Sequence, residues 1–518
     1  MRRTSALALS FIAGAAILII SATSTAAFAQ AGSLDPDFAT AGIGSYFPGS
    51  EHSRSYDIIA LADNSMLLCG YSYANGQQSA GVAHILENGA IDPSFGESSG
   101  YTLLSDGNLT TYTMALAPDQ SIYLAGFSNS PFTIFLAHLS AAGIRDAAFG
   151  TNGIEFTPLA TGQGTCSDMV IQPDGRIVVV GTAYDADAPL NSRSLFIRYL
   201  PNGTLDTDFN NTGILLVDGS PENEGMQGVA LMDDGSIVAA GYDQTGSTLH
   251  NQLMMLNADG TMDLSFGTGG ITEPSLGGTA EGAYDVLVNQ GSIYVVGNTT
   301  LGDNTNGYLA KFNADGTLDT SFGTGGSTIS DFGGIDFLHD LAIQPDGKIV
   351  ACGNTGNYET VITVRYGTDG ALDATFGDAG MSINDLSSGD DELYGIAVQP
   401  DGKIVAAGFT HESSASTIVL RYLNDLGTNV VEVATYGNNV ALAPNPVSGN
   451  LTILQLTGIQ EAQVWISDLH GHVIAAAFHV PKGVTSATVH VNDIPTGVYL
   501  VNVLSDGITT RLKLQVSK

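Results

Sequence analysis

The sequence predicts an all-β protein, most of which consists of repeats of four short strands. Two recurring motifs and the composition lead to this prediction. The pattern Gly-x-x-Asp-x-x-Phe occurs seven times between Gly32 and Phe376, and its copies are 54 to 60 residues apart. A second motif, in which a tight turn joins two apolar runs and the second run ends on a glycine, also occurs seven times. The chain has 64 glycines among 518 residues and only 13% charged residues, which favours short strands and tight turns over long helices. A repeat of this length indicates a repeat architecture.

Each repeat is expected to contribute four antiparallel strands. In residues 344–353 the turn Pro-Asp-Gly separates two strands, because proline presets one turn dihedral and glycine accepts a positive φ. A third strand precedes the next Gly-x-x-Asp, as in residues 361–366, and a short fourth strand follows each Phe-Gly, as in residues 153–156. Seven such units of about 56 residues are typical of a seven-bladed β-propeller.

The ends of the array predict how the ring closes. The first motif begins at Gly32, whereas the third strand of the last repeat, near Arg421, is followed by no further copy. We therefore expect the N-terminal copy to dock where an eighth copy would have been and to join the first and last blades non-covalently, which would leave no exposed sheet edge. An open or split array is the alternative.

Residues 1–29 have the features of a secretory signal peptide. Arg2 and Arg3 precede an apolar run in residues 6–20, and Ala-Phe-Ala at residues 27–29 supplies small residues for cleavage. The run is short for a membrane span of about 20 residues, so a retained anchor is the alternative. After cleavage we expect no transmembrane segment.

The charge balance argues against nucleic acid and anionic lipid as partners. The chain carries 16 Lys and Arg against 52 Asp and Glu, a formal net charge of −36, whereas both partners bind through clustered Lys and Arg. The three cysteines, Cys69, Cys166 and Cys352, have no disulfide or metal-ligand spacing. Cys69 and Cys352 each precede the glycine that closes a repeated strand, and we expect these two to be small apolar core residues.

The combination of Gly-x-Leu-Asp-x-x-Phe-Gly with Gln-Pro-Asp-Gly-Lys-Ile-Val resembles the delta-60 repeat family of bacterial propeller-like proteins. The resemblance covers residues 31–428 and implies a fold, but no shared reaction from which catalytic residues could be transferred. Some copies depart from the pattern. Ala39 and Asn210 replace the glycine after Phe, and Arg145 replaces the usual Leu or Ile.

Residues 441–518 break the period and predict a second domain, separated from the propeller (residues 30–428) by a linker at residues 429–440. Short alternating strands, such as residues 498–503, fit a small Ig-like β-sandwich. The segment resembles the type A C-terminal sorting domain of the type IX secretion system. The resemblance is carried by Pro444, Asn445, Pro446, Gly497 and Tyr499, and by their order in the tail.

This second resemblance implies an export route. The expected partner of the tail is the type IX secretion translocon, and the expected location is secreted or on the outer cell surface, via the periplasm. Cleavage of the sorting domain and its replacement by a surface anchor are both compatible with it.

The repeated aspartates are the first candidates for chemistry. They are Asp35, Asp92, Asp146, Asp206, Asp263, Asp319 and Asp373. Seven equal copies are unlike an asymmetric active site, so we interpret each as a turn cap whose following Phe fills the gap between blades. Calcium is the alternative, because residues 257–263 and 313–319 resemble calcium loops; other copies lack the earlier acidic ligand. No other cofactor is expected.

A basic residue or histidine precedes the turn glycine by five positions in six of the seven repeats. Two hypotheses follow. These residues form a ring of charge that lines a channel, or each pairs with a turn aspartate of its blade.

Variable loops supply the binding-site hypothesis. In a four-strand meander, the Pro-Asp-Gly and Gly-x-x-Asp turns share one face, and the variable connections share the other, where propellers usually carry function. Candidate binding residues on these loops are Asp185, Asp187, Glu222, Glu224, Asp303, Asp390, Asp391 and His411. We expect a module that binds a protein or a glycan. The alternative is a secreted polysaccharide hydrolase or lyase that uses carboxylates near the mouth, such as Asp185, Asp187, Asp390 and Asp391, although no motif assigns a catalytic residue.

Overall fold

The structure is a computed structural model of the chain. It describes residues 30–47, 51–129, 132–185, 188–219, 222–411, 414–424, 440–443, 451–456, 461–467, 473–491, 494–495, 497–505 and 508–516. These residues form strands and turns in two compact units, which are described separately. Among them, no helix is long and apolar enough to cross a membrane. The predicted signal peptide and most of the predicted linker lie outside the described residues.

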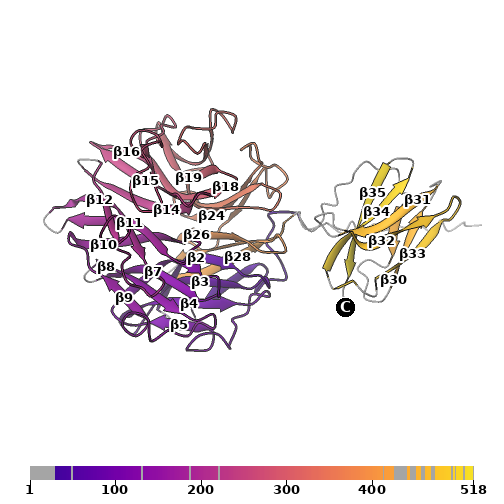
Figure 1. Ribbon diagram of the computed structural model, residues 1–518, viewed down its shortest axis with the longest axis horizontal. Coiled ribbons are helices and arrows are strands. Elements are labelled where there is room, and N and C mark those ends of the chain that lie inside the picture. The colour runs from indigo at the N-terminus through magenta and orange to yellow at the C-terminus, as the bar shows by residue number, and fades with distance from the viewer. Residues whose placement is uncertain are drawn as a thin grey trace, which may run out of the picture. The chain divides into compact units, whose positions relative to one another are not determined.

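The larger unit is a ring of seven four-stranded antiparallel sheets, the blades (Figure 1), which confirms the predicted propeller. Blades one to three comprise β2 to β5 (His52–Ala60, Met66–Ala74, Gln77–Ile85 and Tyr101–Leu104), β6 to β9 (Leu109–Leu116, Ile122–Asn129, Phe132–Leu139 and Ile154–Thr157) and β10 to β13 (Gly162–Ile171, Ile177–Asp185, Ala188–Tyr199 and Ile214–Val217). Blades four to six comprise β14 to β17 (Glu224–Leu231, Ile237–Thr245, Thr248–Leu256 and Ile271–Thr272), β18 to β21 (Glu281–Asn289, Ser292–Leu301, Asn304–Phe312 and Ser327–Ser330) and β22 to β25 (Phe337–Ile343, Ile349–Thr355, Thr360–Tyr366 and Met381–Asn384). Blade seven comprises β26 to β28 (Asp390–Val398, Ile404–His411 and Ala415–Tyr422) and β1 (Ile43–Tyr46).

The second strand of each blade supplies the core between neighbouring blades. In β11 the run of residues 177–180 is fully buried, because both faces of this strand are covered and no side chain alternates to solvent. The preceding turn is a tight hairpin in which Gln172 N donates to Arg176 O at 2.7 Å and Gly175 N donates to Gln172 O at 2.8 Å. The three cysteines are buried and free, and burial raises the pKa of each thiol.

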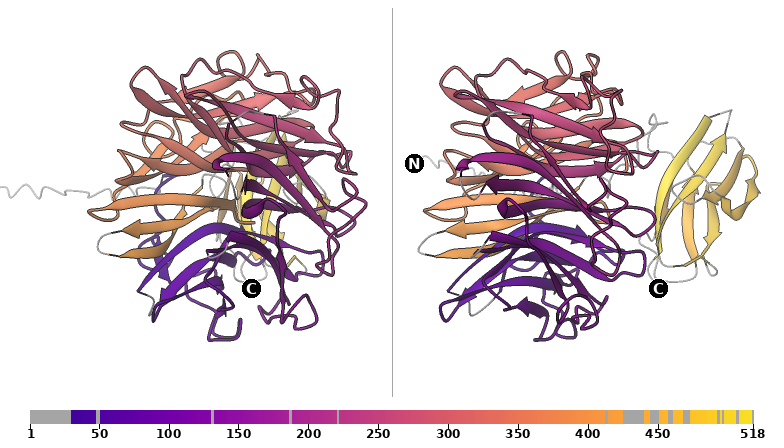
Figure 2. Two further views of the ribbon diagram at one scale, coloured as in Figure 1. Left: turned by 90° about the vertical axis from the view of Figure 1, so that its left-hand side faces the viewer. Right: turned by 60° about the vertical axis from the view of Figure 1, so that its left-hand side comes forward.

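The N-terminal copy of the motif completes blade seven, as the ends of the array predicted. Strand β1 pairs antiparallel with β28 from Ile43↔Leu420 to Tyr46↔Thr417, so the indigo N-terminal strands lie beside the orange strands of the last blade (Figure 2). Residues 31–46, the N-terminal clasp, are also fixed by Asp35, whose Oδ2 accepts Arg421 Nε and Nη2 at 2.9 Å. Both side chains of this pair are 2% exposed. Non-covalent pairing therefore joins the first and last blades.

The seven motif aspartates hold the turns between the third and fourth strands. In every copy the Oδ1 atom accepts the backbone N–H two residues further on, at 2.9 to 3.1 Å. The Phe three residues after each aspartate is at most 4% exposed and packs against the turn glycine of the next repeat. A Cβ at Gly316, for example, would lie 2.9 Å from the ring of Phe266.

The basic residues of the third strands pair with these aspartates. The other carboxylate oxygen contacts an Arg, Lys or His nitrogen in six of the seven copies, at 2.8 to 3.1 Å; Met255 occupies this position in the remaining copy. These basic residues all lie on third strands, whereas the first strands line the centre. They therefore pair with the turn aspartates and do not form a ring of charge along a channel.

The position after each motif Phe adopts the left-handed conformation. In six copies its N–H donates to a carbonyl in the next repeat, as from Gly323 N to Asp369 O at 2.8 Å. The two copies that depart from glycine keep this backbone, with φ of 44° at Ala39 and 46° at Asn210. The architecture therefore imposes the conformation even where the residue does not favour it.

The smaller unit contains two antiparallel sheets. One has the order β29-β30-β33 (Val440–Ala443, Leu451–Leu456 and Ser486–His490), and the other has the order β32-β31-β34-β35 (Val473–Val480, Ala462–Ser467, Gly497–Ser505 and Ile508–Val516). Buried side chains of both sheets, including Leu454 and Val464, form one core. The unit is thus a two-sheet β-structure, whereas the Ig-like topology stays a prediction. Gly497 begins β34, and the Tyr499 hydroxyl donates to Pro495 O at 3.2 Å; Pro444, Asn445 and Pro446 lie outside the described residues.

Candidate ligand-binding site

A cavity of about 550 Å³ lies where the first strands of all seven blades converge. Each of these strands contributes one side chain at an equivalent position. In blade order these are Tyr56, Tyr112, Ser167, Gln227, Tyr284, His339 and Tyr394. The cavity therefore has an aromatic arc on five blades and a polar arc, Ser167 and Gln227, on the other two.

The aromatic rings pack against one another across blade boundaries. Tyr56 stacks on Tyr112 with ring centroids 4.4 Å apart, and its edge meets Tyr394 at 5.2 Å. Tyr394 also stacks on His339 at 4.7 Å. These contacts hold the rings in fixed orientations, and the side chains remain partly accessible from the cavity. Burial lowers the pKa of His339 to about 4, so its imidazole is neutral at pH 7.

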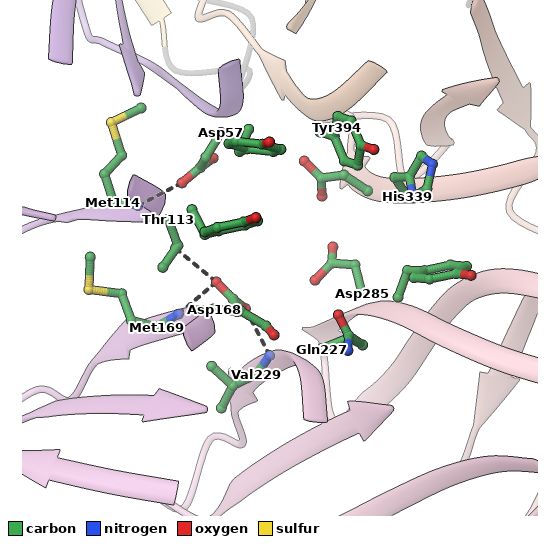
Figure 3. A pocket seen from close by; sticks show the side chains of 15 residues that line it. Asp57, Thr113, Met114, Asp168, Met169, Gln227, Val229, Asp285, His339 and Tyr394 are labelled. Atoms are coloured by element: carbon green, nitrogen blue, oxygen red, sulfur yellow. Dashed lines mark hydrogen bonds between the residues drawn. The ribbon is translucent and has the colours of Figure 1, made fainter. Parts of the chain in front are cut away.

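Four aspartates lie one position further along the same strands: Asp57, Asp168, Asp285 and Asp340. In five of the first strands, a β-bulge lies at or next to this position, and it turns the side chain toward the neighbouring blade. Asp168 accepts Met169 N on its own strand at 2.7 Å and Val229 N on the next blade at 2.8 Å, and Thr113 of the preceding blade donates its hydroxyl at 3.0 Å (Figure 3).

The other three aspartates make the same kind of bridge. Asp57 accepts Met114 N at 2.8 Å, and Asp340 accepts Ile396 N at 2.6 Å. Asp285 accepts Leu341 N at 3.4 Å. In each case a backbone N–H of the next blade donates, so these carboxyl groups connect neighbouring blades at the wall of the cavity.

The enclosure of these carboxyl groups raises their pKa values. Burial raises the pKa of Asp57 to about 6 and that of Asp168 to about 8. Burial also raises the pKa of Asp285, and burial together with the charge of Asp285 raises that of Asp340 well above its usual range. Part of the cluster therefore holds protons at pH 7. All four side chains keep some surface toward the cavity.

Two of the eight loop residues suggested by the sequence are buried and hold the loops between blades. Glu224 Oε1 accepts Gly219 N at 2.8 Å, and Asp391 Oδ2 accepts Leu386 N at 2.8 Å and Ser387 N at 3.1 Å. Burial raises the pKa of Glu224 to about 7. Because these carboxyl groups face inward, we do not assign them to a ligand site.

The structure does not gather the remaining acidic candidates into one site. Asp185 accepts Arg193 Nη2 at 2.8 Å, Asp303 and Asp390 are exposed, and Glu222 is half-buried; Asp187 lies outside the described residues. The part of the chain that the structure describes also contains no group of three or more His, Cys, Asp or Glu that could hold a metal ion. In residues 257–263 and 313–319, Asp259 and Asp315 each accept N–H and hydroxyl groups of their own turn.

His411 is a sequence candidate that lines a pocket. It lies with His52 and Arg54 in a second pocket, of about 330 Å³, on blades one and seven. The residues of the main cavity were missed by sequence reasoning. One signal could have revealed them. An aspartate lies thirteen residues before the closing glycine in three of the repeats, at Asp57, Asp168 and Asp340.

Comparisons with known proteins match both parts of the chain. The family "Domain of unknown function (DUF5122) beta-propeller" matches residues 61–95, 172–209, 233–266, 291–322, 344–376 and 399–426. The "Secretion system C-terminal sorting domain" matches residues 441–517. No curated protein matched the sequence.

Solved structures that resemble the chain do so weakly. The polysaccharide lyase Uly1 has a TM-score of 0.42 at 10% identity, over 73% of this chain and 94% of that one. Sqt1 of Chaetomium thermophilum has a TM-score of 0.35 at 12% identity, over 73% and 98%. The Trypanosoma rangeli sialidase has a TM-score of 0.35 at 9% identity, over 94% and 88%. Likenesses at this level support no argument about function.

Proposed function

We propose that this protein, which carries DUF5122 β-propeller repeats and a secretion system C-terminal sorting domain, binds a glycan in the aromatic cavity of its propeller. The sorting domain directs the chain through a type IX secretion system to the cell surface or the extracellular space, and implies recognition by that machinery. The function proposed here is thus exercised outside the cell, where polysaccharides are the abundant ligands.

The observation that carries the proposal is the division of the cavity wall into two arcs. Tyr56, Tyr112 and Tyr394 line the cavity from three consecutive blades and keep part of each ring accessible beside their mutual contacts, and Ser167 and Gln227 add hydroxyl and amide groups from two other blades. A pyranose ring has the matching amphipathic character, since its axial C–H groups form an apolar patch and its hydroxyl groups surround the edge. An aromatic side chain can cover such a patch, while polar groups fix the orientation of the sugar.

The size of the cavity favours a small ligand over a protein surface. Its volume of about 550 Å³ lies within the range of about 300 to 1,000 Å³ found for small-molecule sites. A stable protein partner would instead bury about 800 Å² on each side, which a cavity of this size at the centre of a ring does not offer. A sugar or the end of a glycan chain fits this space.

Titration of the full-length protein with neutral oligosaccharides tests the proposal. We would use isothermal calorimetry with cello-, xylo-, manno- and galacto-oligosaccharides, on the parent protein and on Tyr112→Ala. Loss of one stacking ring, at about 1 kcal/mol, should weaken binding about fivefold. Tyr294→Ala is the matched control, because this half-buried tyrosine of β19 lies outside the cavity and faces Lys311.

Binding by none of the oligosaccharides, or equal loss in Tyr112→Ala and Tyr294→Ala, would contradict a glycan site in the cavity. Thermal unfolding of each variant shows whether the fold survives the substitution. A variant that unfolds early is replaced by Tyr112→Leu, which keeps most of the buried volume.

The rival function is a polysaccharide hydrolase or lyase. The observation in its favour is the set of cavity carboxyl groups with raised pKa values, since a carboxylic acid that keeps its proton near neutral pH can act as a general acid. Asp57 and Asp168, however, both accept N–H groups from two strands, which commits them to the frame. Release of reducing or unsaturated ends from any polysaccharide, lost in Asp168→Asn, would establish the enzyme.

A further inference from the structure

Arg54 differs from the other cations of the propeller in having no carboxylate partner. Residues 30–424 contain ten Lys and Arg, and nine of them form ion pairs with Asp or Glu among the described residues. No ion pair of Arg54 is found there: the Tyr56 side chain hydrogen-bonds to it, and the Glu392 carboxyl interacts with its charge without forming an ion pair. In a chain with 52 acidic residues, a partly buried guanidinium left without a carboxylate is costly and calls for a ligand.

The surroundings of Arg54 form a small pocket of their own. His52, Tyr71 and His411 line it with Arg54, together with Ser414 and Ala415. The guanidinium lies 3.9 Å from the centroid of the Phe409 ring. Stacking of this kind restricts the guanidinium plane while its N–H edge stays available to an acceptor.

The pocket adjoins the aromatic cavity. Arg54 lies two residues before Tyr56 on β2, so both side chains leave the same face of the strand. Tyr71 of the pocket lies 6.2 Å from Tyr56 of the cavity, centroid to centroid. A group attached to a sugar in the cavity therefore has only a short distance to reach the guanidinium.

We propose that the Arg54 pocket binds an oxyanion carried by the glycan, a carboxylate or a sulfate ester, so that the ligand class is an acidic glycan. Guanidinium groups bind such planar or tetrahedral oxyanions with paired N–H donors. The His52 and His411 rings and the Ser414 hydroxyl supply further donors around it. This inference rests on the proposed glycan site and adds the charge of its ligand.

The overall negative charge is compatible with one anionic subsite. Long polyanions need many cations along their path, which this chain lacks, but a single oxyanion needs only a local one. At physiological salt, charges beyond about 8 Å are largely screened. The contact with Arg54 therefore outweighs carboxylates beyond that distance, and the nearby Glu392 is half-buried and accepts the Tyr394 hydroxyl at 2.7 Å.

Two matched pairs of charged and neutral probes test the inference on the full-length protein. They are trigalacturonate, its methyl ester, and a sulfated galactan oligosaccharide with its desulfated form, titrated by calorimetry at fixed ionic strength. We expect at least one anionic probe to bind about tenfold or more tightly than its neutral counterpart, as for hydrogen bonds to charged groups. Arg54→Gln should remove that preference while binding of the neutral form persists.

Arg193→Gln is the control, because Arg193 is a cation of similar exposure that pairs with Asp185 and Asp218. Arg193→Gln removes the same unit of charge as Arg54→Gln but leaves the Arg54 pocket intact. The variant protein should therefore keep its preference for the anionic probe. Uronate preference alone assigns a carboxylate and sulfate preference alone assigns a sulfate ester. Equal binding of the charged and neutral forms, or a preference that survives Arg54→Gln, overturns the anion subsite and leaves the glycan site standing. Absence of binding by every probe, neutral and charged, overturns the glycan site itself.

Discussion

Breaking the ion pair of the N-terminal clasp should open the ring at one place. Asp35→Asn leaves Arg421 buried without its carboxylate, at a site where both side chains are 2% exposed. Removing one partner of a buried pair costs about 3 to 5 kcal/mol. At the clasp, this cost falls on strand β1, which only non-covalent pairing with β28 connects to the last blade.

Hydrogen exchange of the full-length protein measures this opening directly. Residues 31–46 are held by β28 and by bonds such as Gly32 N to Leu423 O at 2.8 Å. If the substitution acts on local opening, the amides of these residues should exchange roughly two to three powers of ten faster. The inner strands of blades two to six should keep their protection.

Asp206→Asn is the matched control, because it breaks a buried ion pair in a blade that does not close the ring. Asp206 forms a similarly buried pair with Arg198, at 2.8 Å and 4% exposure on both sides, and also accepts Arg176 Nε at 2.8 Å, but short covalent connections tether every strand of its blade. It should lower the melting temperature by a similar amount and leave residues 31–46 protected. Retained protection of residues 31–46 in Asp35→Asn, or equal loss there in Asp206→Asn, would refute the clasp.

Three further predictions concern other parts of the molecule. The cavity aspartates have folded pKa values above the unfolded ones, so they stabilise the protein below about pH 4, and this contribution is lost as pH rises toward about 8. Chemical denaturation across this range should show a falling stability, with a slope that Asp168→Asn reduces by up to about 1.4 kcal/mol per pH unit; an unchanged slope would contradict the raised pKa. Gly323→Ala should destabilise the protein by about 3 kcal/mol, because its Cβ would lie 2.4 Å from Ser327 O. Gly325→Ala is the control: its Cβ would have nothing within 4 Å, so it should cost only the backbone strain of about 1 kcal/mol. Equal losses of stability in thermal melts would show that the contact with Ser327 O is irrelevant. Trp465 is the single tryptophan of the sequence and lies in β31, so tryptophan emission should vanish from the exported product if the sorting domain is removed, and its persistence would show that the domain is retained.

The repeat spacing was enough to predict the blades, because each blade is a local structure. The four strands of a blade and their turns lie within one period, and the turn chemistry of Gly-x-x-Asp-x-x-Phe is read within seven residues. The closure of the ring was predictable for the same reason. The first motif, at Gly32, has no third strand before it, and the last third strand, near Arg421, has no motif after it. The order of its motifs identified the tail. The same motifs do not specify how its strands connect, so the Ig-like topology stays a prediction.

The orientation of individual loop carboxylates was not predictable. Asp390 and Asp391 are neighbours in the sequence, yet Asp390 is exposed and Asp391 is buried, because consecutive residues of a strand point to opposite sides. Loop composition alone predicted the same role for both residues. The register of β26 against its neighbouring strands decides which of the two carboxylates is exposed and which is buried.

The composition, the repeat period and the turn motifs determined the all-β ring, because those features act over short stretches of chain, and the resemblance of the tail to a sorting domain implied export. The cavity was decided only by the tertiary structure. Tyr56 and Tyr394 are more than 300 residues apart in the sequence and meet at 5.2 Å only after the ring has closed. Arg54 became a candidate for the same reason, since its lack of a carboxylate partner is a property of the assembled blades and not of any motif around it.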